Sequence, residues 1–130
     1  MMDTVERAIK EADEWLVSAK DKLEAAESDH SAANVCCALA VHAIIRANDA
    51  LSLKFLRIKA TRHDDAPVMF SKLLQQNKLG RENLRFLRLL QKAMADKSGA
   101  DYGKKIFSYE DAKKYAEEAE EFVAFVKSQV

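Results

Sequence analysis

The stretch "AANVCCALAVHAIIRANDALSLKFL", residues 32–56, decides the fold. It is apolar almost all the way around a helical circumference, and a helix of that kind is contacted on several sides. We therefore expect it to be the central helix. Three of its few polar residues, His42, Arg46 and Asp49, follow one another by four and three positions and so share a stripe. Two interpretations are open: the stripe is the exposed face of the helix, which we favour, or it is an ion-paired seam at an interface.

Helical patterns also flank this stretch on both sides. Residues 3–26 place apolar side chains at helical spacing, and Asp29 or Ser31 can cap the helix that follows. We expect a third helix to open at Asp64 or Asp65 with Pro67 and to run to about residue 77. The remaining expected features are a left-handed cap at Gly80, a fourth helix over about 81–95 that buries Leu84, Leu87, Leu90 or Gln91, and Met94, and a last helix opened by a capping box of Ser108 and Asp111.

Composition agrees with this pattern. The chain of 130 residues has three glycines and one proline, and no stretch alternates with period two for long enough to form a strand. The sequence therefore predicts an all-α fold, an antiparallel up-and-down helical bundle of four to five helices. We see no internal repeat or domain boundary, so we expect residues 1–130 to form one domain.

Two cysteines and the N-terminal segment bear on cell compartment. Cys36 and Cys37 are adjacent within an apolar helical run, which predicts packing as small hydrophobes and argues against a disulfide framework or a zinc site. No uninterrupted apolar run reaches the roughly 18 residues of a membrane span. The acidic N-terminus "MMDTVERAIKEADEW" is unlike a signal peptide. We expect a cytoplasmic protein.

The net charge of zero hides an uneven distribution. Residues 1–53 carry 5 basic and 10 acidic side chains, residues 54–105 carry 13 and 5, and residues 106–130 carry 3 and 6. The three segments therefore have net charges of −5, +8 and −3. A basic middle segment can meet an anionic ligand. The alternative, which we favour slightly, is that oppositely charged helices of the chain face each other.

Within the basic segment, Arg81, Arg85, Arg88 and Lys92 follow one another by four, three and four positions. They form one stripe on the expected fourth helix and could neutralise several phosphates. The alternative is a helix edge that contacts solvent and acidic neighbours. Motifs of metal-dependent or nucleophilic enzymes are absent from the sequence, including a glycine-rich phosphate loop and zinc-spaced histidines.

The segment "DKSGADYGKKIFSYEDA", residues 96–112, lies between two helical patterns and holds two of the three glycines. Gly99 and Gly103 flank the Asp101-Tyr102 pair, and Lys97, Lys104 and Lys105 add positive charge. We expect a long connection between helices here. Taken from the residues alone, a packed structural connection is favoured over contact with a small anion or nucleotide.

Three segments, in this order, carry a family resemblance. "HSAANVCCALAVHAIIRANDAL", residues 30–51, resembles the second helix of HEPN domains, and "TRHDDAPVMFSKLL", residues 61–74, resembles the Thr-x-His turn that opens their next helix. "KSGADYGKKIFSYEDAKKYAEEAEEFVAFV", residues 97–126, resembles their Arg-x-x-Ala-Asp-Tyr loop and final helix. The resemblance spans roughly residues 30–126.

The resemblance implies a helical bundle that forms a homodimer and associates with a minimal nucleotidyltransferase, commonly as toxin and antitoxin. Many members are ribonucleases that need no metal or other cofactor and use an Arg followed four to six residues later by a His. Here Lys97 stands where that Arg would be, and Tyr102 where the His would be. Tyrosine with a pKa near 10 is a poor base at neutral pH, and lysine lacks the bidentate fork of arginine.

We therefore predict a non-catalytic, homodimeric partner of a nucleotidyltransferase that contacts nucleotide or RNA. One alternative is a metal-independent ribonuclease with a divergent active site, and a second is a structural interaction module. Neither a cofactor nor a metal is expected. The candidate contacts with nucleotide, RNA or partner are Arg62, His63, Arg85, Arg88, Lys97, Asp101 and Tyr102.

Overall fold

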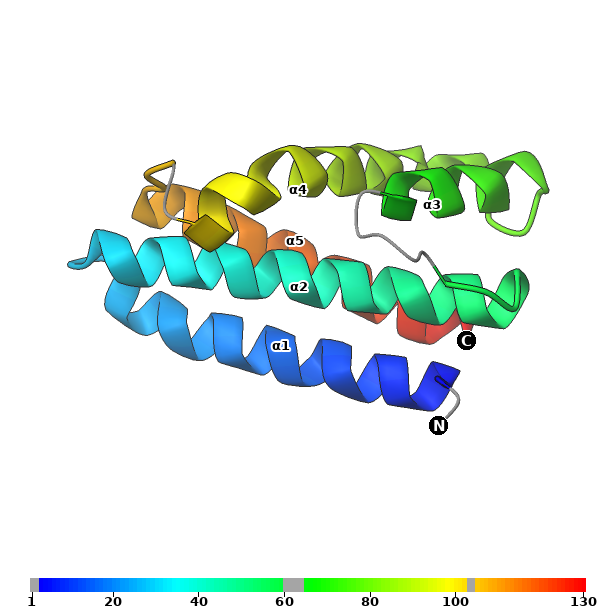
Figure 1. Ribbon diagram of the computed structural model, residues 1–130, viewed down its shortest axis with the longest axis horizontal. Helices are drawn as coiled ribbons and strands as arrows, with labels where there is room; N and C mark the ends of the chain where they lie inside the picture. The colour runs from blue at the N-terminus through cyan, green and yellow to red at the C-terminus, as the bar shows by residue number, and fades with distance from the viewer. Residues whose placement is uncertain (1–2, 60–64, 103–104) are drawn as a thin grey trace.

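The computed structural model describes residues 3–59, 65–102 and 105–130, and for residues 98, 99, 101 and 102 it describes the helical backbone alone. Within these ranges the chain is all-helical, without a strand. Four long helices alternate in direction along the chain: α1 (Val5–Ala26), α2 (His30–Phe55), α4 (Leu84–Tyr102) and α5 (Tyr109–Gln129) (Figure 1). The short α3 (Ala66–Gln75) and the 3₁₀ turn η2 (Arg81–Asn83) lie between α2 and α4. The predicted all-α bundle is confirmed.

The central position predicted for the apolar stretch is also confirmed, because α2 contacts α1, α3, α4 and α5. Its fully buried side chains include Val41, Ile44 and Leu51. By length and composition α2 could cross a membrane, but 72% of the residues in its most apolar window are buried inside the bundle. A core helix passes the same test, so the cytoplasmic location stays a prediction.

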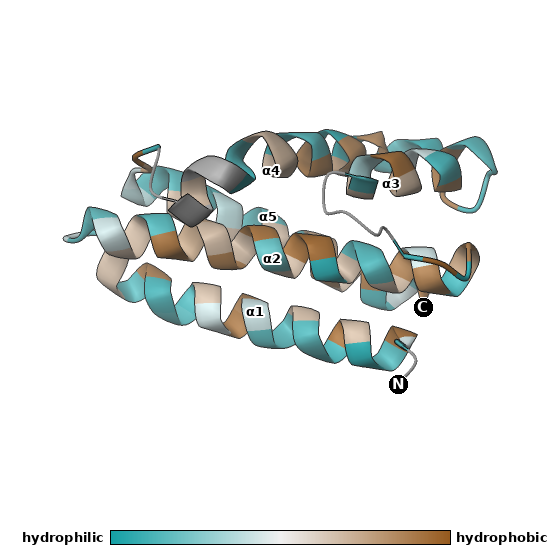
Figure 2. Cartoon of the chain, viewed as in Figure 1, coloured by the Kyte–Doolittle hydropathy of each residue, from teal (hydrophilic) through white to brown (hydrophobic). Residues whose placement is uncertain are grey.

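Two kinds of packing hold the other helices around α2. The inward side of α1 is rich in alanine, with Ala8, Ala12 and Ala19 fully buried. Figure 2 shows the edge of α1 turned toward α2 as apolar and its opposite edge as hydrophilic. Aromatic rings join the other helices, since the Phe86 ring of α4 lies 5.2 Å from that of Phe122 and 4.8 Å from that of Phe125 on α5. Small side chains thus bring α1 close, and large ones fill the other side.

Capping explains where several helices begin. The capping box of Ser108 and Asp111 is confirmed, with reciprocal backbone-to-side-chain hydrogen bonds of 3.0 and 3.1 Å. Of the two residues offered for α2, Asp29 is the cap, accepting from the Ser31 N–H at 2.9 Å. At α3 the cap position is Asp65, but its side chain makes no capping hydrogen bond.

Two sequence expectations about the α3–α4 region were wrong. The left-handed residue after α3 is Asn77, at φ 56°, whereas Gly80 is extended at φ −68°. Asn tolerates this conformation, and the Lys78 N–H then closes the helix on the Leu73 carbonyl at 2.9 Å. The expected inward face of the fourth helix was wrong at Leu84, which is exposed. Of the alternatives Leu90 and Gln91, Leu90 is the buried one, and the expected Leu87 and Met94 are partly buried and pack against the core. The other buried residues of this face are Phe86, Leu89 and Ala93.

Candidate functional site at the junction of α4 and α5

The helix α4 extends further than its sequence predicts. Residues 96–102 continue the helix to Tyr102 instead of forming a connection from residue 96 onward. Ala93 and Ala100, two turns apart, are both buried in the core, so apolar spacing persists through this segment. That burial offsets the roughly 1 kcal/mol that Gly99 costs within a helix. The candidate residues Lys97, Asp101 and Tyr102 therefore belong to the end of α4.

The described part of the following connection, residues 105–108, is fixed to α2 by one side chain. The Asn34 amide donates to the Lys105 carbonyl at 2.7 Å, and its oxygen accepts from the Phe107 N–H at 2.9 Å. The Phe107 side chain is buried immediately before the Ser108 cap. The Asn34 amide, by donating one hydrogen bond and accepting another, replaces two backbone hydrogen bonds. It thereby fixes the position of the residues that lead into α5. The sequence signal for it was an Asn within an apolar run.

Asp96 is the centre of the polar contacts at this junction. Its side chain, 14% exposed, accepts hydrogen bonds from the Tyr115 hydroxyl and from Lys105 Nζ, the latter at 3.1 Å. Burial alone would raise the pKa of Asp96, but the bonds from Tyr115 and Lys105 outweigh it and lower the pKa. Burial and the neighbouring Asp96 raise the pKa of Tyr115. Tyr115 therefore stays protonated as a donor and cannot act as a base near neutral pH.

Lysines gather around this pair. Lys92 Nζ lies 4.6 Å from the centre of the Tyr115 ring and 3.9 Å from a Glu118 carboxylate oxygen. Lys105 Nζ lies 5.1 Å from the centre of the Phe107 ring. Lys97 follows Asp96 on α4 and is partly exposed. Asp96 is thus a partly buried carboxylate whose ion-pair partner is Lys105, and the neighbouring Lys92 pairs with Glu118.

The basic stripe on α4 divides into two parts. Arg85 forms an ion pair with Glu121 and Lys92 with Glu118, and both carboxylates are on α5. This is the contact between oppositely charged helices that the sequence suggested. Arg81 and Arg88 are exposed, and among the described residues neither makes an ion pair with a carboxylate. Their positive charge faces solvent.

The predicted site residues are therefore only partly brought together. Five of the seven, Arg85, Arg88, Lys97, Asp101 and Tyr102, lie on α4, with Arg85 and Arg88 further from its end than the other three. The side chains of Asp101 and Tyr102 lie outside the described residues, as do Arg62 and His63 altogether. Sequence reasoning missed Asn34, Asp96 and Tyr115 because it treated each as an ordinary helix or connection residue.

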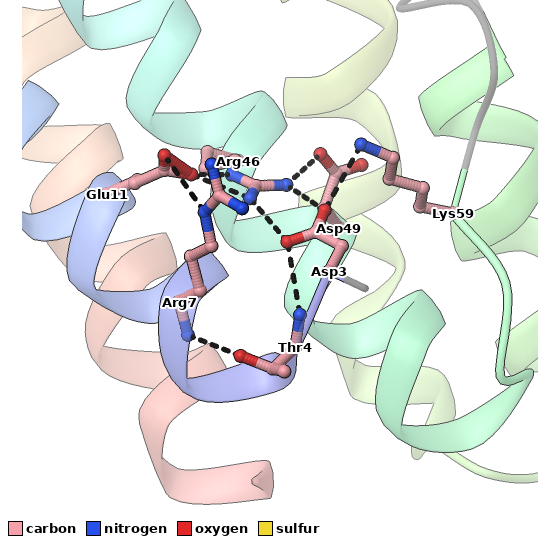
Figure 3. A network of polar contacts seen from close by, with 7 residues as sticks. All are labelled: Asp3, Thr4, Arg7, Glu11, Arg46, Asp49 and Lys59. Carbon is pink, nitrogen blue, oxygen red and sulfur yellow. Dashed lines mark hydrogen bonds and ion pairs between the residues drawn. The ribbon is translucent and has the colours of Figure 1, made fainter. Parts of the chain in front are cut away.

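A second polar cluster lies where the N-terminal segment meets α2 (Figure 3). The Arg46 guanidinium contacts Asp3 at 2.8 Å, Glu11 at 2.6 Å and Asp49 at 3.0 Å, and Lys59 Nζ lies 3.1 Å from Asp3. The Arg46 side chain is only 14% exposed. The favoured interpretation of this stripe as an exposed face was therefore wrong at Arg46 and Asp49, which form an ion-paired seam.

Protonation in the cluster follows from this pairing. The hydrogen bond from Arg46 holds the pKa of Asp3 well below its usual range, and the bond to Asp3 raises the pKa of Arg46. For Asp49, burial outweighs the bond from Arg46 and raises the pKa. The cluster joins α1 to α2, and with Arg7, 3.8 Å from Glu11, it holds three cations and three carboxylates. Its role is structural.

The cysteines do not supply a nucleophile. Both thiols are fully buried, as predicted, and burial raises their pKa values to about 11 for Cys36 and about 12 for Cys37. Cys36 Sγ instead donates to the Ala19 carbonyl at 3.2 Å. Among the residues that the structure describes, no group of three His, Cys, Asp or Glu side chains is placed to hold a metal ion.

Comparison of the sequence with protein-family models and with curated proteins gave no match.

Proposed function

We propose that this protein is a HEPN-like, homodimeric partner of a minimal nucleotidyltransferase, without catalytic activity of its own. In this proposal it contacts the phosphates of a nucleotide or RNA through the basic surface of α4. The order of the three family-like segments and the all-helical bundle support it. Cytoplasmic location and a toxin–antitoxin pairing are parts of the same proposal.

The observation that carries the proposal is the exposed positive charge of η2 and the start of α4. Arg81 in η2 and Arg88 on α4 face solvent without a carboxylate partner among the described residues. Phosphate groups bind such cations with release of counterions. The helix ends at Ala100-Asp101-Tyr102, where the family-like segment lies.

The chemistry near Lys97 argues against catalysis. A ribonuclease of the family type needs a base to activate the RNA 2′-hydroxyl and a cation to stabilise the charged phosphorane. Tyr115 is held protonated by burial and by its bond to Asp96. Asp96 in turn is engaged by Tyr115 and Lys105. A binding role therefore fits these residues better than a catalytic one.

The phosphate contact is tested by the salt dependence of binding. A fluorescent single-stranded RNA is titrated with the protein at salt concentrations between 50 and 200 mM, and the affinity is measured by anisotropy. We expect the double variant Arg81→Ala/Arg88→Ala to bind more weakly and to lose about two from the slope of log affinity against log salt. The matched control, Lys10→Ala/Lys22→Ala on α1, removes the same charge from another helix and is expected to keep the wild-type slope.

The protein partner is tested by co-purification of the tagged chain from its native host at moderate salt. A stoichiometric nucleotidyltransferase is the expected result. A dimer with neither a nucleotidyltransferase nor RNA affinity would leave a structural interaction module and overturn the proposal. Metal-free cleavage of the RNA that disappears in Lys97→Ala would overturn it in favour of the ribonuclease.

A further inference from the structure

A groove runs between α3 and the first turns of α4. It consists of two adjoining hollows of about 280 and 330 Å³, which share Gln75. The first is lined by Leu74, Gln75, Arg81 and Leu84, and the second by Pro67, Val68, Ser71, Lys72, Gln75, Leu87 and Gln91. We refer to these residues together as the α3–α4 groove.

The groove leaves apolar side chains in water. Val68 is 51% exposed and Leu84 is 45% exposed, one from each helix, and Leu87 between them is only partly buried. The core-facing side of α3 consists of other residues, Ala66, Phe70 and Leu73, which are fully buried. Val68 and Leu84 therefore belong to a second apolar surface, separate from the core. Covering it would be favourable because apolar area leaves water.

Cations border this surface. Lys72 is on the α3 side, Arg81 is at one end, and Arg88 is one turn beyond Leu84 on α4. All three are exposed, and none pairs with a carboxylate among the described residues. The acidic residue of the turn is Glu82, whose carboxylate lies back over Gly80, where an added Cβ would clash with it. The rim is therefore positively charged around an apolar floor.

We propose that the α3–α4 groove receives an amphipathic helix of a partner protein, with its apolar stripe on Val68, Leu84 and Leu87 and its acidic flanks on Lys72, Arg81 and Arg88. Two roughly parallel walls of helix suit a third helix laid along them. Charge complementarity selects an acidic occupant and sets its orientation. This deepens the proposed function, on which it rests, by naming the surface for the protein partner. Because the same two arginines, Arg81 and Arg88, are the proposed phosphate contacts, the partner helix and RNA would compete for them.

A second copy of this chain is a weaker occupant. On α1 of such a copy the exposed large apolar residues are Val17, beside Glu14 and Asp21, and Trp15, whose ring is already stacked on His42. Docking of α1 into the groove of the next copy would be head-to-tail and would not close by two-fold symmetry. A helix with several apolar anchors fills the groove better.

The test uses a labelled synthetic 18-residue helical peptide with leucines at i, i+3, i+4 and i+7 and glutamates on both flanks. Anisotropy is expected to show binding that weakens with salt. The double variant Val68→Ser/Leu84→Ser is expected to lose at least tenfold in affinity, and Lys72→Ala/Arg88→Ala to lose affinity mainly at low salt. The control Val17→Ser/Val35→Ser changes two exposed valines elsewhere, 58% and 43% exposed, and is expected to bind as the wild type does.

Circular dichroism is used to check that each variant is folded. We expect all of them to fold, because the substituted side chains are exposed. Equal binding of a peptide with lysine flanks, or equal binding by Val68→Ser/Leu84→Ser, would overturn the groove proposal. RNA is a further possible occupant. If RNA displaces the peptide, and if the variant Val68→Ser/Leu84→Ser also loses affinity for RNA, the groove is an RNA site and the partner-helix proposal is wrong. If the peptide binds as expected but no nucleotidyltransferase co-purifies, the groove remains a binding site for an acidic helix and the proposed function is wrong. If a nucleotidyltransferase binds the variant Val68→Ser/Leu84→Ser with the same affinity as it binds the wild type, the groove is not its binding site, and the groove proposal is wrong while the proposed function is kept.

Discussion

Arg46 shows how one residue on an apolar helix can be both polar and structural. Its guanidinium meets Asp3, Glu11 and Asp49, three carboxylates that come from three different turns of the chain. Several donors in a planar fork let one arginine satisfy all of them. A spacing argument placed His42, Arg46 and Asp49 on one stripe correctly. It could not show that Asp3 and Glu11 would cover that stripe, because those residues are distant in the sequence.

Replacing Arg46 with methionine tests the seam. Arg46→Met keeps an apolar stem but leaves the buried Asp49 without its cation and Asp3 with Lys59 alone, so we expect a loss of about 3 kcal/mol in the free energy of unfolding. Urea denaturation measures it. Asp3→Asn should cost less in the Arg46→Met background than in the wild type, with a coupling of about 1–3 kcal/mol. Additive costs would contradict the pairing.

Tyr115 makes a second residue-scale prediction. Tyr115→Phe removes the hydroxyl that donates to Asp96 and leaves that carboxylate with Lys105. We expect a loss of about 1–2 kcal/mol in the free energy of unfolding, measured by urea denaturation. Tyr109→Phe, on the partly buried side chain at the start of α5, is the matched control and should cost less. Equal costs would show that the Tyr115 bond to Asp96 contributes nothing.

The cysteines allow a chemical test of burial. Both thiols are buried, with pKa values raised to about 11 and about 12, so little thiolate forms at pH 8. We expect no reaction of the native protein with a disulfide reagent over minutes, and reaction of both cysteines in guanidinium chloride. Rapid labelling of the native protein would show that the centre of α2 is open to solvent.

At the scale of elements, sequence periodicity predicted the helices well where one face is clearly apolar. On α5 the residues at helical spacing from Ala112 to Val126 form one face of the sequence pattern, and all seven are buried: Ala112, Tyr115, Ala116, Ala119, Phe122, Val123 and Val126. For α4 the prediction was wrong at Leu84, which is exposed and lines the groove. It was right at Leu90, which is fully buried, and Leu87 and Met94 are partly buried and pack against the core. Gly99 also suggested an early end, whereas the burial of Ala100 keeps the last turn helical.

Asn34 carries an element-scale prediction. It fixes residues 105–107 to α2 through two hydrogen bonds, so Asn34→Ala leaves the Lys105 carbonyl and Phe107 N–H to water. We expect a loss of about 1–3 kcal/mol in the free energy of unfolding and faster hydrogen exchange at the Phe107 amide. Asn83→Ala, on the exposed η2 turn, is the control and should leave Phe107 exchange unchanged. Unchanged exchange in Asn34→Ala would contradict the clamp.

For the whole molecule, the candidate site was predicted less completely than the fold. The sequence located the basic helix and the family-like segment at its end, because both are local patterns. The partners that neutralise Arg85, Lys92 and Lys105 are on other turns or helices, so spacing alone could not separate paired cations from Arg81 and Arg88. The surface that remains positive is defined by tertiary contacts.

Charge pairing across the molecule also predicts its behaviour in acid. Asp3 and Asp96 have pKa values lowered by their partners, so the stability they contribute is present above the unfolded pKa of about 3.9 and is lost as pH falls below it. The raised pKa of Asp49 acts in the opposite sense, since its effect lowers stability as pH rises above about 4. Below pH 4 only the first two matter among these three groups.

We therefore expect the free energy of unfolding, measured by urea denaturation, to fall steadily between about pH 4 and pH 2. Asp3→Asn should be less stable than the wild type at pH 6, because it loses its charge-assisted bond to Arg46. The difference should shrink as pH falls, because below about pH 3.9 the Asp3 carboxyl of the unfolded wild-type chain is protonated and must lose its proton to form the bond to Arg46 on folding. Glu24→Gln, an exposed change on α1, should stay within about 0.5 kcal/mol of the wild type throughout. A constant gap between Asp3→Asn and the wild type down to pH 2 would show that the Asp3–Arg46 pair does not set the acid limit of this bundle.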